Sequence, residues 1–122
     1  MHKLALLLIA LLLTSGCESV WVVPPASGRA VDTRSRHPIA RAEVTRICAD
    51  APATTKTDAA GNFKFRGKRT LRVALGDPLC AAASYRIEAA GYETAETNVF
   101  AFGWANQRGL RHNLGEIQIA PK

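Results

Sequence analysis

The segment Asp58-Ala-Ala-Gly61-Asn62-Phe63-Lys64-Phe65 decides the fold class of this chain. Asp58 and Gly61 are typical of a tight turn, because an Asp side chain accepts hydrogen bonds from the backbone that follows and Gly adopts a positive φ without strain. Directly after the turn, Phe63 and Phe65 alternate with polar neighbours, which is the period of a strand with one buried face. The segment therefore predicts a tight turn followed by a strand whose two phenylalanines lie in the core.

Similar alternating runs occur on both sides of this strand, separated by turn residues, and no βαβ rhythm accompanies them. In the run 70–75, Leu71, Val73 and Leu75 are expected to face inward. The Ala-rich stretch from Leu79 to Ala90 also fits helical spacing, so one short helical turn is expected near residues 79–83, before the strand at 85–89. The sequence thus predicts an all-β, seven-stranded antiparallel sandwich, with strands at 28–32, 42–47, 62–65, 70–75, 85–89, 96–102 and 114–119.

The N-terminal segment has the composition of a bacterial export signal. A short basic start is followed by the unbroken apolar run from Leu4 to Leu13 and then by small residues. The run is too short to span a bilayer as a helix, which takes about 20 apolar residues. Residues 1–16 are therefore predicted to be a signal peptide.

The small residues end in a cysteine, and Thr14-Ser15-Gly16-Cys17 after the leucine run resembles a bacterial lipobox. The resemblance implies that Cys17 is acylated on its sulfur and becomes the mature N-terminus, so that acyl chains hold the protein on a membrane. By the same resemblance, Glu18 rather than Asp after the cysteine favours the periplasmic face of the outer membrane. The alternative is ordinary signal cleavage that leaves an unmodified cysteine.

A proline-containing segment separates this cysteine from the alternating runs. Residues 17–26, with Pro24-Pro25, are expected to form a lipidated tether, and residues 27–122 the sandwich. The hydrophobic run Val20-Trp21-Val22-Val23 is unusual for a linker. Two alternatives remain open for it: an edge strand, or a segment that lies against lipid headgroups.

Two cysteines remain once Cys17 is assigned to lipid. Cys48 and Cys80 are an even pair in an oxidising compartment, where disulfides are stable. A metal site is the competing interpretation, but the sequence has neither C-x-x-C nor H-E-x-x-H, and the mature chain has only His37 and His112. The sequence predicts a Cys48–Cys80 disulfide and no metal or other cofactor.

The chain is basic, with 16 Lys and Arg against 10 Asp and Glu in 122 residues. This length accommodates one domain with a modest core and excludes a large α/β enzyme with a deep substrate cleft. The basic residues are expected to be solvated strand faces that block edge-to-edge pairing; the alternative is a positive surface for anionic headgroups or an acidic partner. Nucleic acid is not an expected partner outside the cytoplasm. Half of these residues fall in two clusters: Arg29, Arg34, Arg36 and Arg41, then Arg66, Lys68, Arg69 and Arg72.

An aromatic segment precedes the last predicted strand. Phe100, Phe102 and Trp104 recur at a spacing of two and are followed by Arg108 and Arg111. Phe100 and Phe102 are expected to cap the sandwich core. The alternative is a partly exposed interaction patch of Phe102, Trp104, Arg108 and Arg111, because aromatic and Arg side chains are enriched at binding hot spots.

Four motifs occur in a characteristic order along the chain. They are Gly28-x-Ala30-x-Asp32, His37-Pro38-Ile39-Ala40-x-Ala42-x-Val44, Thr57-Asp58-x-x-Gly61-x-Phe63-x-Phe65 and Tyr85-x-Ile87-x-x-x-Gly91-Tyr92. In this order and spacing they resemble the carboxypeptidase regulatory-like domain, over residues 27 to about 100. The resemblance implies a seven-stranded transthyretin-like (prealbumin-like) sandwich and a role as an accessory or interaction module rather than a reaction.

No pattern in the chain points to catalysis, and we expect no catalytic residues. His37 and His112 lack the His-x-x-Glu spacing of the zinc carboxypeptidases that such modules accompany. The chain ends Ile-Ala-Pro-Lys, whereas the 5-hydroxyisourate hydrolases of the transthyretin-like fold end in a Tyr-Arg-Gly-Ser type of tail. Ser84, His112 and Asp77 form a triad only by arbitrary choice, because no nucleophile elbow accompanies them.

The sequence therefore predicts a non-enzymatic outer-membrane lipoprotein that binds a protein or an envelope ligand. Its expected partners are the membrane, through the N-terminal lipid, and an envelope protein. One alternative is a scaffold subunit of an envelope or secretion complex, since the type VI secretion lipoprotein also combines a lipobox with a transthyretin-like fold. A small periplasmic hydrolase is a further, disfavoured alternative.

Overall fold

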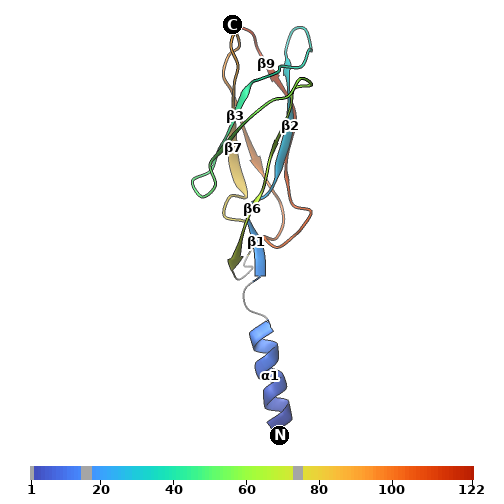
Figure 1. The fold of residues 1–122 in the computed structure, drawn as a ribbon, viewed down its shortest axis with the longest axis vertical. Coiled ribbons are helices and arrows are strands. Elements are labelled where there is room, and N and C mark those ends of the chain that lie inside the picture. Colours follow the sequence, from blue (N-terminus) through green and yellow to red (C-terminus); the bar gives the residue numbers. More distant parts are fainter. Residues whose placement is uncertain (1, 15–17, 73–75) are drawn as a thin grey trace.

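The computed structural model describes residues 2–14, 18–72 and 76–122. Within these residues lie one helix, α1 (His2–Thr14), and nine strands (Figure 1). No helix in this part of the chain is both long and apolar enough to cross a membrane. The strands are β1 (Glu18–Val23), β2 (Ala26–Asp32), β3 (Glu43–Ile47), β4 (Ala53–Lys56), β5 (Asn62–Phe65), β6 (Lys68–Arg72), β7 (Ala82–Glu88), β8 (Ala95–Phe100) and β9 (His112–Ile119).

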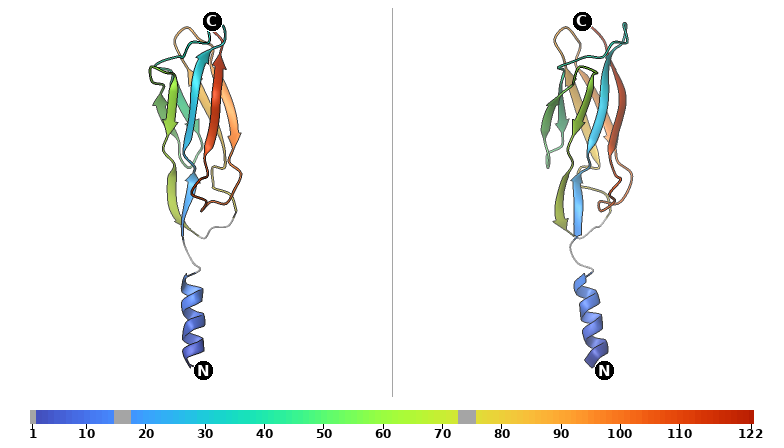
Figure 2. Two further views of the ribbon diagram at one scale, coloured as in Figure 1. Left: turned by 90° about the vertical axis from the view of Figure 1, so that its right-hand side faces the viewer. Right: turned by 45° about the vertical axis from the view of Figure 1, so that its right-hand side comes forward.

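The strands form a β-sandwich. One sheet has the order β5-β2-β9 and the other β4-β3-β7-β8, and the views in Figure 2 show the two sheets packed face to face. β1 and β6 pair as a separate two-stranded ribbon at the end of the sandwich opposite the C-terminus (Figure 1). We call this the ribbon end, and the end that carries the C-terminus the far end.

The core lies between the two sheets, as the alternating pattern predicts. Phe63 and Phe65 on β5 are 2% and 6% exposed, and they pack with Val44, Tyr85 and Ile87 from the opposite sheet. The ring centroids of Phe65 and Tyr85 are 5.4 Å apart. The prediction that the two phenylalanines are buried is therefore confirmed.

The turn before β5 is built as the sequence predicts. The Asp58 carboxylate accepts hydrogen bonds from the backbone N–H groups of Ala60 and Asn62, at 3.0 and 2.9 Å. Gly61 has a φ of 78°, and a Cβ at this position would lie 2.5 Å from the carbonyl oxygen of Ala30. Both the backbone angle and the lack of space therefore require glycine here.

Other motif residues contact one another across the sandwich. A Cβ on Gly28 would lie 2.5 Å from Cζ of Phe63, so this glycine makes room for the aromatic ring. The Tyr92 hydroxyl donates a hydrogen bond to the Asp32 carboxylate at 2.8 Å. Backbone N–H groups that follow Asp32, together with this hydroxyl, hold the pKa of its carboxyl below the usual range. Residues 60 positions apart in the chain are thus joined at the far end.

The prediction of seven antiparallel strands is wrong in two respects. The structure has two additional strands, β1 and β4, and β2 pairs with β9 in parallel, from Ala26 opposite His112 to Asp32 opposite Ile119. β4 reads Ala-Thr-Thr-Lys, which lacks large apolar residues at alternate positions. The β2–β9 pairing joins opposite ends of the domain sequence, so no local pattern encodes its direction.

The prediction of a tether over residues 17–26 is also wrong. Residues 18–23 form β1, and Val20, Val22 and Val23 are 0%, 5% and 0% exposed. β1 pairs antiparallel with β6, from Glu18 opposite Arg72 onward. A segment with three buried valines belongs to the fold, so the edge strand is the correct alternative for this run.

Two local expectations near the ribbon end are also wrong. The predicted helical turn over residues 79–83 is absent. Instead, one tight turn is closed by the hydrogen bond from the N–H of Ala81 to the carbonyl of Pro78, and β7 begins directly afterwards at Ala82. Leu71 is 73% exposed rather than inward, because β6 pairs with β1 and is not covered by the opposite sheet. Val73 and Leu75 lie outside the described residues.

Candidate functional site

Cys17, the predicted lipid attachment residue, lies outside the residues that the structure describes. The residue that follows it, Glu18, is the first residue of β1 and pairs with Arg72 of β6. No residues are therefore left between Cys17 and the folded domain to act as a spacer. In the chain, Cys17 is directly adjacent to the ribbon end.

Cys48 and Cys80 form a disulfide, with Cα atoms 6.2 Å apart. The N–H of Cys80 donates to the carbonyl of Val22 at 2.7 Å. Cys80 packs with Val22, Val23 and Ala51 in a second hydrophobic cluster, and Cys48 packs against both this cluster and the main core. The disulfide therefore joins the loop after β3 to the segment before β7 at the place where β1 packs.

One group of metal-ligand side chains lies together within the described parts of the chain. Ligand atoms of Cys48, Asp50 and Cys80 are within 4.8 Å of one another. An ion would need cysteine thiolates, and sulfurs that bond to each other offer none. The group therefore fits a disulfide with a neighbouring carboxylate.

The predicted interaction patch lies on the loop of residues 101–111, between β8 and β9. Phe102 and Trp104 are 84% and 62% exposed, and Arg108 and Arg111 are exposed as well. The expectation that Phe100 and Phe102 cap the core is wrong, because Phe100 is 43% exposed and its ring packs on that of Phe102, with centroids 4.9 Å apart. β8 ends at Phe100, so the chain leaves the sheet before Phe102 can reach the core.

The loop is fixed against β1 by hydrogen bonds. The backbone N–H of Trp21 donates to the carbonyl of Ala105 at 2.7 Å, and the indole N–H of Trp21 donates to the carbonyl of Gln107 at 3.0 Å. The side-chain amide of Asn106 lies 3.2 Å from both carboxylate oxygens of Glu18. The loop therefore holds Phe102 and Trp104 in solvent beside the first residues of the domain.

Arg111 has a different neighbourhood from the two aromatic residues. It lines a shallow groove of about 220 Å³ together with Pro25, Ser27 and Lys64. The structure thus places all four predicted patch residues on one loop, while Arg111 faces the groove beside β2 and β5.

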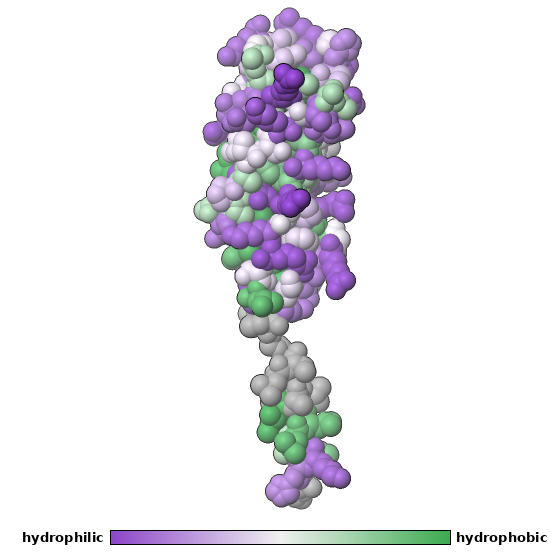
Figure 3. Space-filling model, viewed as in Figure 1, coloured by the Kyte–Doolittle hydropathy of each residue, from purple (hydrophilic) through white to green (hydrophobic). Residues whose placement is uncertain are grey.

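β6 adds cations and an apolar side chain to the same end. The Arg69 guanidinium lies 4.3 Å from the ring centroid of Trp21 and donates to the Ser19 hydroxyl at 2.8 Å. Leu71 on the same strand is exposed. Figure 3 shows a small group of hydrophobic atoms on the visible face of the ribbon end, next to hydrophilic side chains. We define the ribbon-end surface as Lys68, Arg69, Leu71, Arg72, Leu79, Phe102, Trp104 and Arg108.

A buried polar pair lies inside the sandwich, and the sequence patterns did not indicate it. Tyr85 and His112 are both 0% exposed. The Tyr85 hydroxyl is 2.8 Å from Nδ1 of His112, and Nε2 of His112 is 2.7 Å from the carbonyl oxygen of Ala81. Since a carbonyl only accepts, Nε2 carries the proton and Nδ1 accepts from the Tyr85 hydroxyl. Burial lowers the pKa of His112 and raises the pKa of Tyr85 to about 12, so both side chains are neutral near pH 7.

Arg46 is a third buried polar side chain next to this pair. Its Nε donates to the carbonyl of Ala51 at 2.9 Å and its Nη1 to that of Arg66 at 3.0 Å, and the guanidinium lies 5.3 Å from the Phe65 ring centroid. Burial lowers the pKa of Arg46. Arg46 lies two positions after the buried Val44 in the same predicted strand, and this spacing is the signal from which an inward side chain could have been predicted. His112 lies outside every predicted strand, so no pattern indicated its burial.

The triad of Ser84, His112 and Asp77 is not assembled. Ser84 precedes Tyr85 on β7, so its side chain points to the opposite face of the sheet from the core that holds His112. The Ser84 hydroxyl bonds to Asn98 on β8, and both ring nitrogens of His112 are already used. Asp77 is exposed at the ribbon end.

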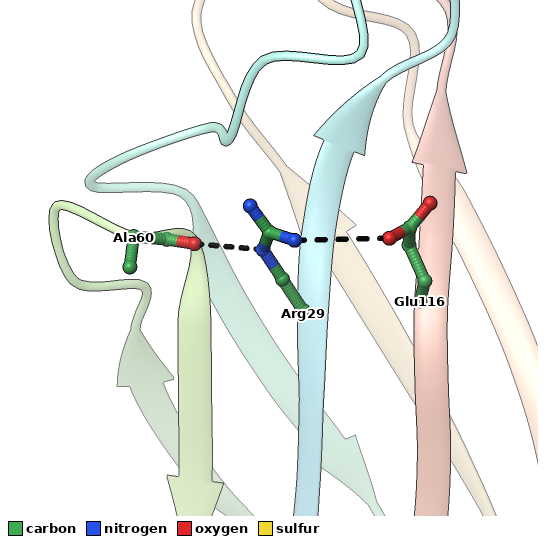
Figure 4. A network of polar contacts seen from close by, with 3 residues as sticks. All are labelled: Arg29, Ala60 and Glu116. Atoms are coloured by element: carbon green, nitrogen blue, oxygen red, sulfur yellow. Dashed lines mark hydrogen bonds and ion pairs between the residues drawn. The ribbon is translucent and has the colours of Figure 1, made fainter.

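Arg29, from the first basic cluster, links neighbouring segments on the outer face of the β5-β2-β9 sheet (Figure 4). Its Nε donates to the carbonyl of Ala60 at 3.0 Å, and Nη1 lies 3.8 Å from the carboxylate of Glu116 on β9. Both charged side chains are about half exposed, so the ion pair contributes little on its own. Through these contacts Arg29 connects the turn before β5 to β9, which is a structural role.

Comparison with known proteins indicates the fold alone. The sequence matches no protein-family model and no curated protein. Among solved structures, 3-chlorocatechol 1,2-dioxygenase from Rhodococcus opacus 1CP is similar, with a TM-score of 0.54 and 16% identity over 80% of this chain and 59% of the dioxygenase. At this identity the likeness supports the β-sandwich and nothing about activity.

Two further structures are similar at lower TM-scores. One is the Coh3ScaB–XDoc_M2ScaA type II cohesin–X-dockerin complex from Acetivibrio cellulolyticus, with a TM-score of 0.44 and 20% identity over 79% of this chain and 56% of that one. The other is a 9R-lipoxygenase from Cyanothece PCC8801, with a TM-score of 0.39 and 15% identity over 79% of this chain and 16% of that one. The chain spans less than two thirds of the length of each of these proteins.

Proposed function

We propose that this protein is a non-enzymatic outer-membrane lipoprotein, attached through acyl chains on Cys17, whose sandwich on the periplasmic face is a binding module for a protein or envelope ligand. One observation carries the proposal. Cys17, which ends the lipobox-like segment, is followed at once by a folded domain, and the end of the domain nearest Cys17 displays Phe102 and Trp104.

The exposed aromatic residues support a binding role. Apolar surface in water is unfavourable in proportion to its area, and the loop that carries Phe102 and Trp104 is held by hydrogen bonds rather than free to bury them. Contiguous exposed apolar side chains rimmed by polar ones mark interaction sites, and aromatic and Arg residues contribute most to such sites.

The contacts of His112 and Ser84 support a non-enzymatic role. A general base must reach the proton that it removes, whereas His112 is fully buried with both nitrogens bonded. Ser84 belongs to the opposite face of β7. The polar pair of Tyr85 and His112 therefore serves the core of the sandwich.

We propose further that the sandwich is a transthyretin-like domain of the carboxypeptidase regulatory-like kind, with additional strands. The support is that the motif residues make specific contacts: Gly28 faces Phe63, Asp58 and Gly61 build the turn, and Tyr92 bonds to Asp32. Such a domain is an accessory or interaction module, which agrees with a lipid-held binding protein.

Metabolic labelling of cells tests the proposed attachment. Cells that express the wild-type chain in the presence of labelled palmitate should incorporate label, and density-gradient fractions should place the protein in the outer membrane. Cys17→Ser should abolish both the label and the membrane location, while Cys48→Ser keeps the label and serves as the matched cysteine control. Equal labelling of wild type and Cys17→Ser would refute the attachment at Cys17.

A further inference from the structure

We infer that the ribbon-end surface contacts the membrane, and that its occupant is a layer of anionic lipid headgroups. The inference rests on the proposed attachment at Cys17 and names the partner of the same aromatic loop. According to this inference, the domain lies directly on the lipid surface and is not separated from it by a flexible tether.

The position of Glu18 is the first step. A residue spans at most about 3.6 Å of extended chain, and Glu18 follows Cys17 and already belongs to β1. With acyl chains on Cys17 in the hydrocarbon, Glu18 therefore lies in the headgroup layer, which is roughly 5–8 Å deep on each side of a bilayer. Side chains that surround Glu18 must lie in this layer or at its surface.

The aromatic loop and β6 are the segments that surround Glu18. Asn106 of the loop bonds to the Glu18 carboxylate, and Trp104 is two residues before Asn106. On the other side, β6 pairs with β1, with Leu71 opposite Ser19 and Arg72 opposite Glu18. Both segments are thus fixed at the level of the first folded residue.

The apolar side chains of the ribbon-end surface suit an interface between water and lipid. Leu71, Leu79, Phe102 and Trp104 are 73%, 56%, 84% and 62% exposed. Aromatic side chains, Trp above all, concentrate at the headgroup level of membrane proteins because one part of the ring is apolar and another polar. Contact with lipid would remove these side chains from water without a protein partner.

Basic side chains outnumber acidic ones at the ribbon end, by four to three. Three acidic residues lie near the ribbon-end surface. The Glu18 carboxylate accepts a hydrogen bond from the side-chain amide of Asn106. The backbone carbonyls of Asp77 and Asp50 accept hydrogen bonds from the side chains of Arg72 and Lys68, respectively. Basic side chains near an anionic leaflet attract it, within about a Debye length. The surface itself contributes four cations, at Lys68, Arg69, Arg72 and Arg108.

Fluorescence of Trp104 in vesicles tests the inference. The full chain is purified from cell membranes and reconstituted into vesicles of phosphatidylethanolamine and phosphatidylglycerol that contain phospholipid brominated near the headgroup. Trp21 is the only other tryptophan, so the difference between wild type and Trp104→Phe isolates the emission of Trp104. We expect this emission to shift to the blue and to be quenched by the bromines.

Charge reversals supply the matched variants. Lys68→Glu with Arg108→Glu should weaken the quenching of Trp104, whereas Arg34→Glu with Lys56→Glu, an equal charge change on exposed residues away from the ribbon end, should leave it intact. Vesicles of phosphatidylcholine alone should give weaker quenching than the anionic vesicles. Equal quenching of the two double variants would show that the basic side chains of this surface do not hold it on lipid.

Two further outcomes separate this inference from the proposed function. Mass spectrometry of the same sample reports acyl chains on Cys17, so an unacylated cysteine refutes the attachment whatever Trp104 does. An acylated protein whose Trp104 keeps the emission of a water-exposed indole would overturn the membrane contact and leave the attachment standing. If that emission shifts only in native outer-membrane vesicles, a protein occupies the surface instead of lipid.

Discussion

At the residue scale, the Tyr85–His112 pair shows how this small core accommodates polar side chains. The hydroxyl, both imidazole nitrogens and the carbonyl of Ala81 form one chain of hydrogen bonds. Buried polar groups cost little when they are fully bonded and much when one partner is missing. The pair therefore stabilises the sandwich only while His112 remains neutral.

Stability should consequently depend on pH in the range where histidine titrates. Burial holds the pKa of His112 below its usual 6.5, so the unfolded chain takes up a proton more readily than the folded one. The contribution of His112 is then complete above about pH 6.5 and is lost as the pH falls through the lower folded pKa. Urea unfolding between about pH 7.5 and pH 5 should show a decreasing free energy of unfolding.

Two histidine variants test whether His112 causes this decrease in the free energy of unfolding. His112→Gln should lower the free energy of unfolding at neutral pH and remove much of its decrease in this range. His37→Gln, at an exposed position, is the matched control and should behave like wild type. A decrease that persists unchanged in His112→Gln would show that another group is responsible.

At the element scale, the segments that pack against β1 and pair with it explain why it forms a strand. It is covered on one side by the Cys48–Cys80 cluster and paired on the other with β6. The disulfide closes a loop across a sequence separation of 32 residues. By chain entropy such a loop stabilises the folded state by roughly 3–4 kcal/mol.

Removal of the disulfide should therefore weaken the domain by about that amount. We expect Cys48→Ala with Cys80→Ala to lower the free energy of unfolding by roughly 3–4 kcal/mol, measured by urea unfolding of the purified protein. Reduced wild type, which keeps the same side chains, is the control for lost packing. Free, alkylatable thiols in native wild type, or zinc recovered with them, would contradict the disulfide and favour a metal at Cys48, Asp50 and Cys80.

At the scale of the whole molecule, the domain has two parts of unequal packing. The main cluster joins both sheets through residues of β2, β3, β5, β7 and β9, whereas the second cluster, to which β1 contributes Val22 and Val23, contains only a few small and medium-sized side chains. β6 has β1 as its sole partner strand among the described residues. The ribbon should therefore open more readily than the sandwich.

Hydrogen exchange measures this difference. Amides of β2 and β7, which are paired on both sides, should exchange slowest, and amides of β6 fastest among the strands. Reduction of the disulfide should accelerate exchange in β1 more than in β2. Uniform exchange across both parts would mean that the ribbon and the sandwich unfold as one unit.

The sequence by itself determined the local elements whose residues carry the signal within a few positions. The alternation of Phe63 and Phe65 and the turn chemistry of Asp58 and Gly61 identified β5 with its correct bounds. Alternation likewise located the centres of β2, β3, β7, β8 and β9, because a half-buried strand has a period of two wherever it lies. The β-sandwich class followed from these strands.

The tertiary structure alone decided which surfaces meet. Val20–Val23 became a strand because the Cys48–Cys80 cluster and β6 cover it, and Leu71 and Phe102 stayed in solvent because their segments extend past the opposite sheet. The parallel pairing of β2 with β9 and the contact of Tyr85 with His112 join residues distant in the chain. Burial and pairing depend on the neighbours that folding brings, and a local pattern carries no information about those neighbours.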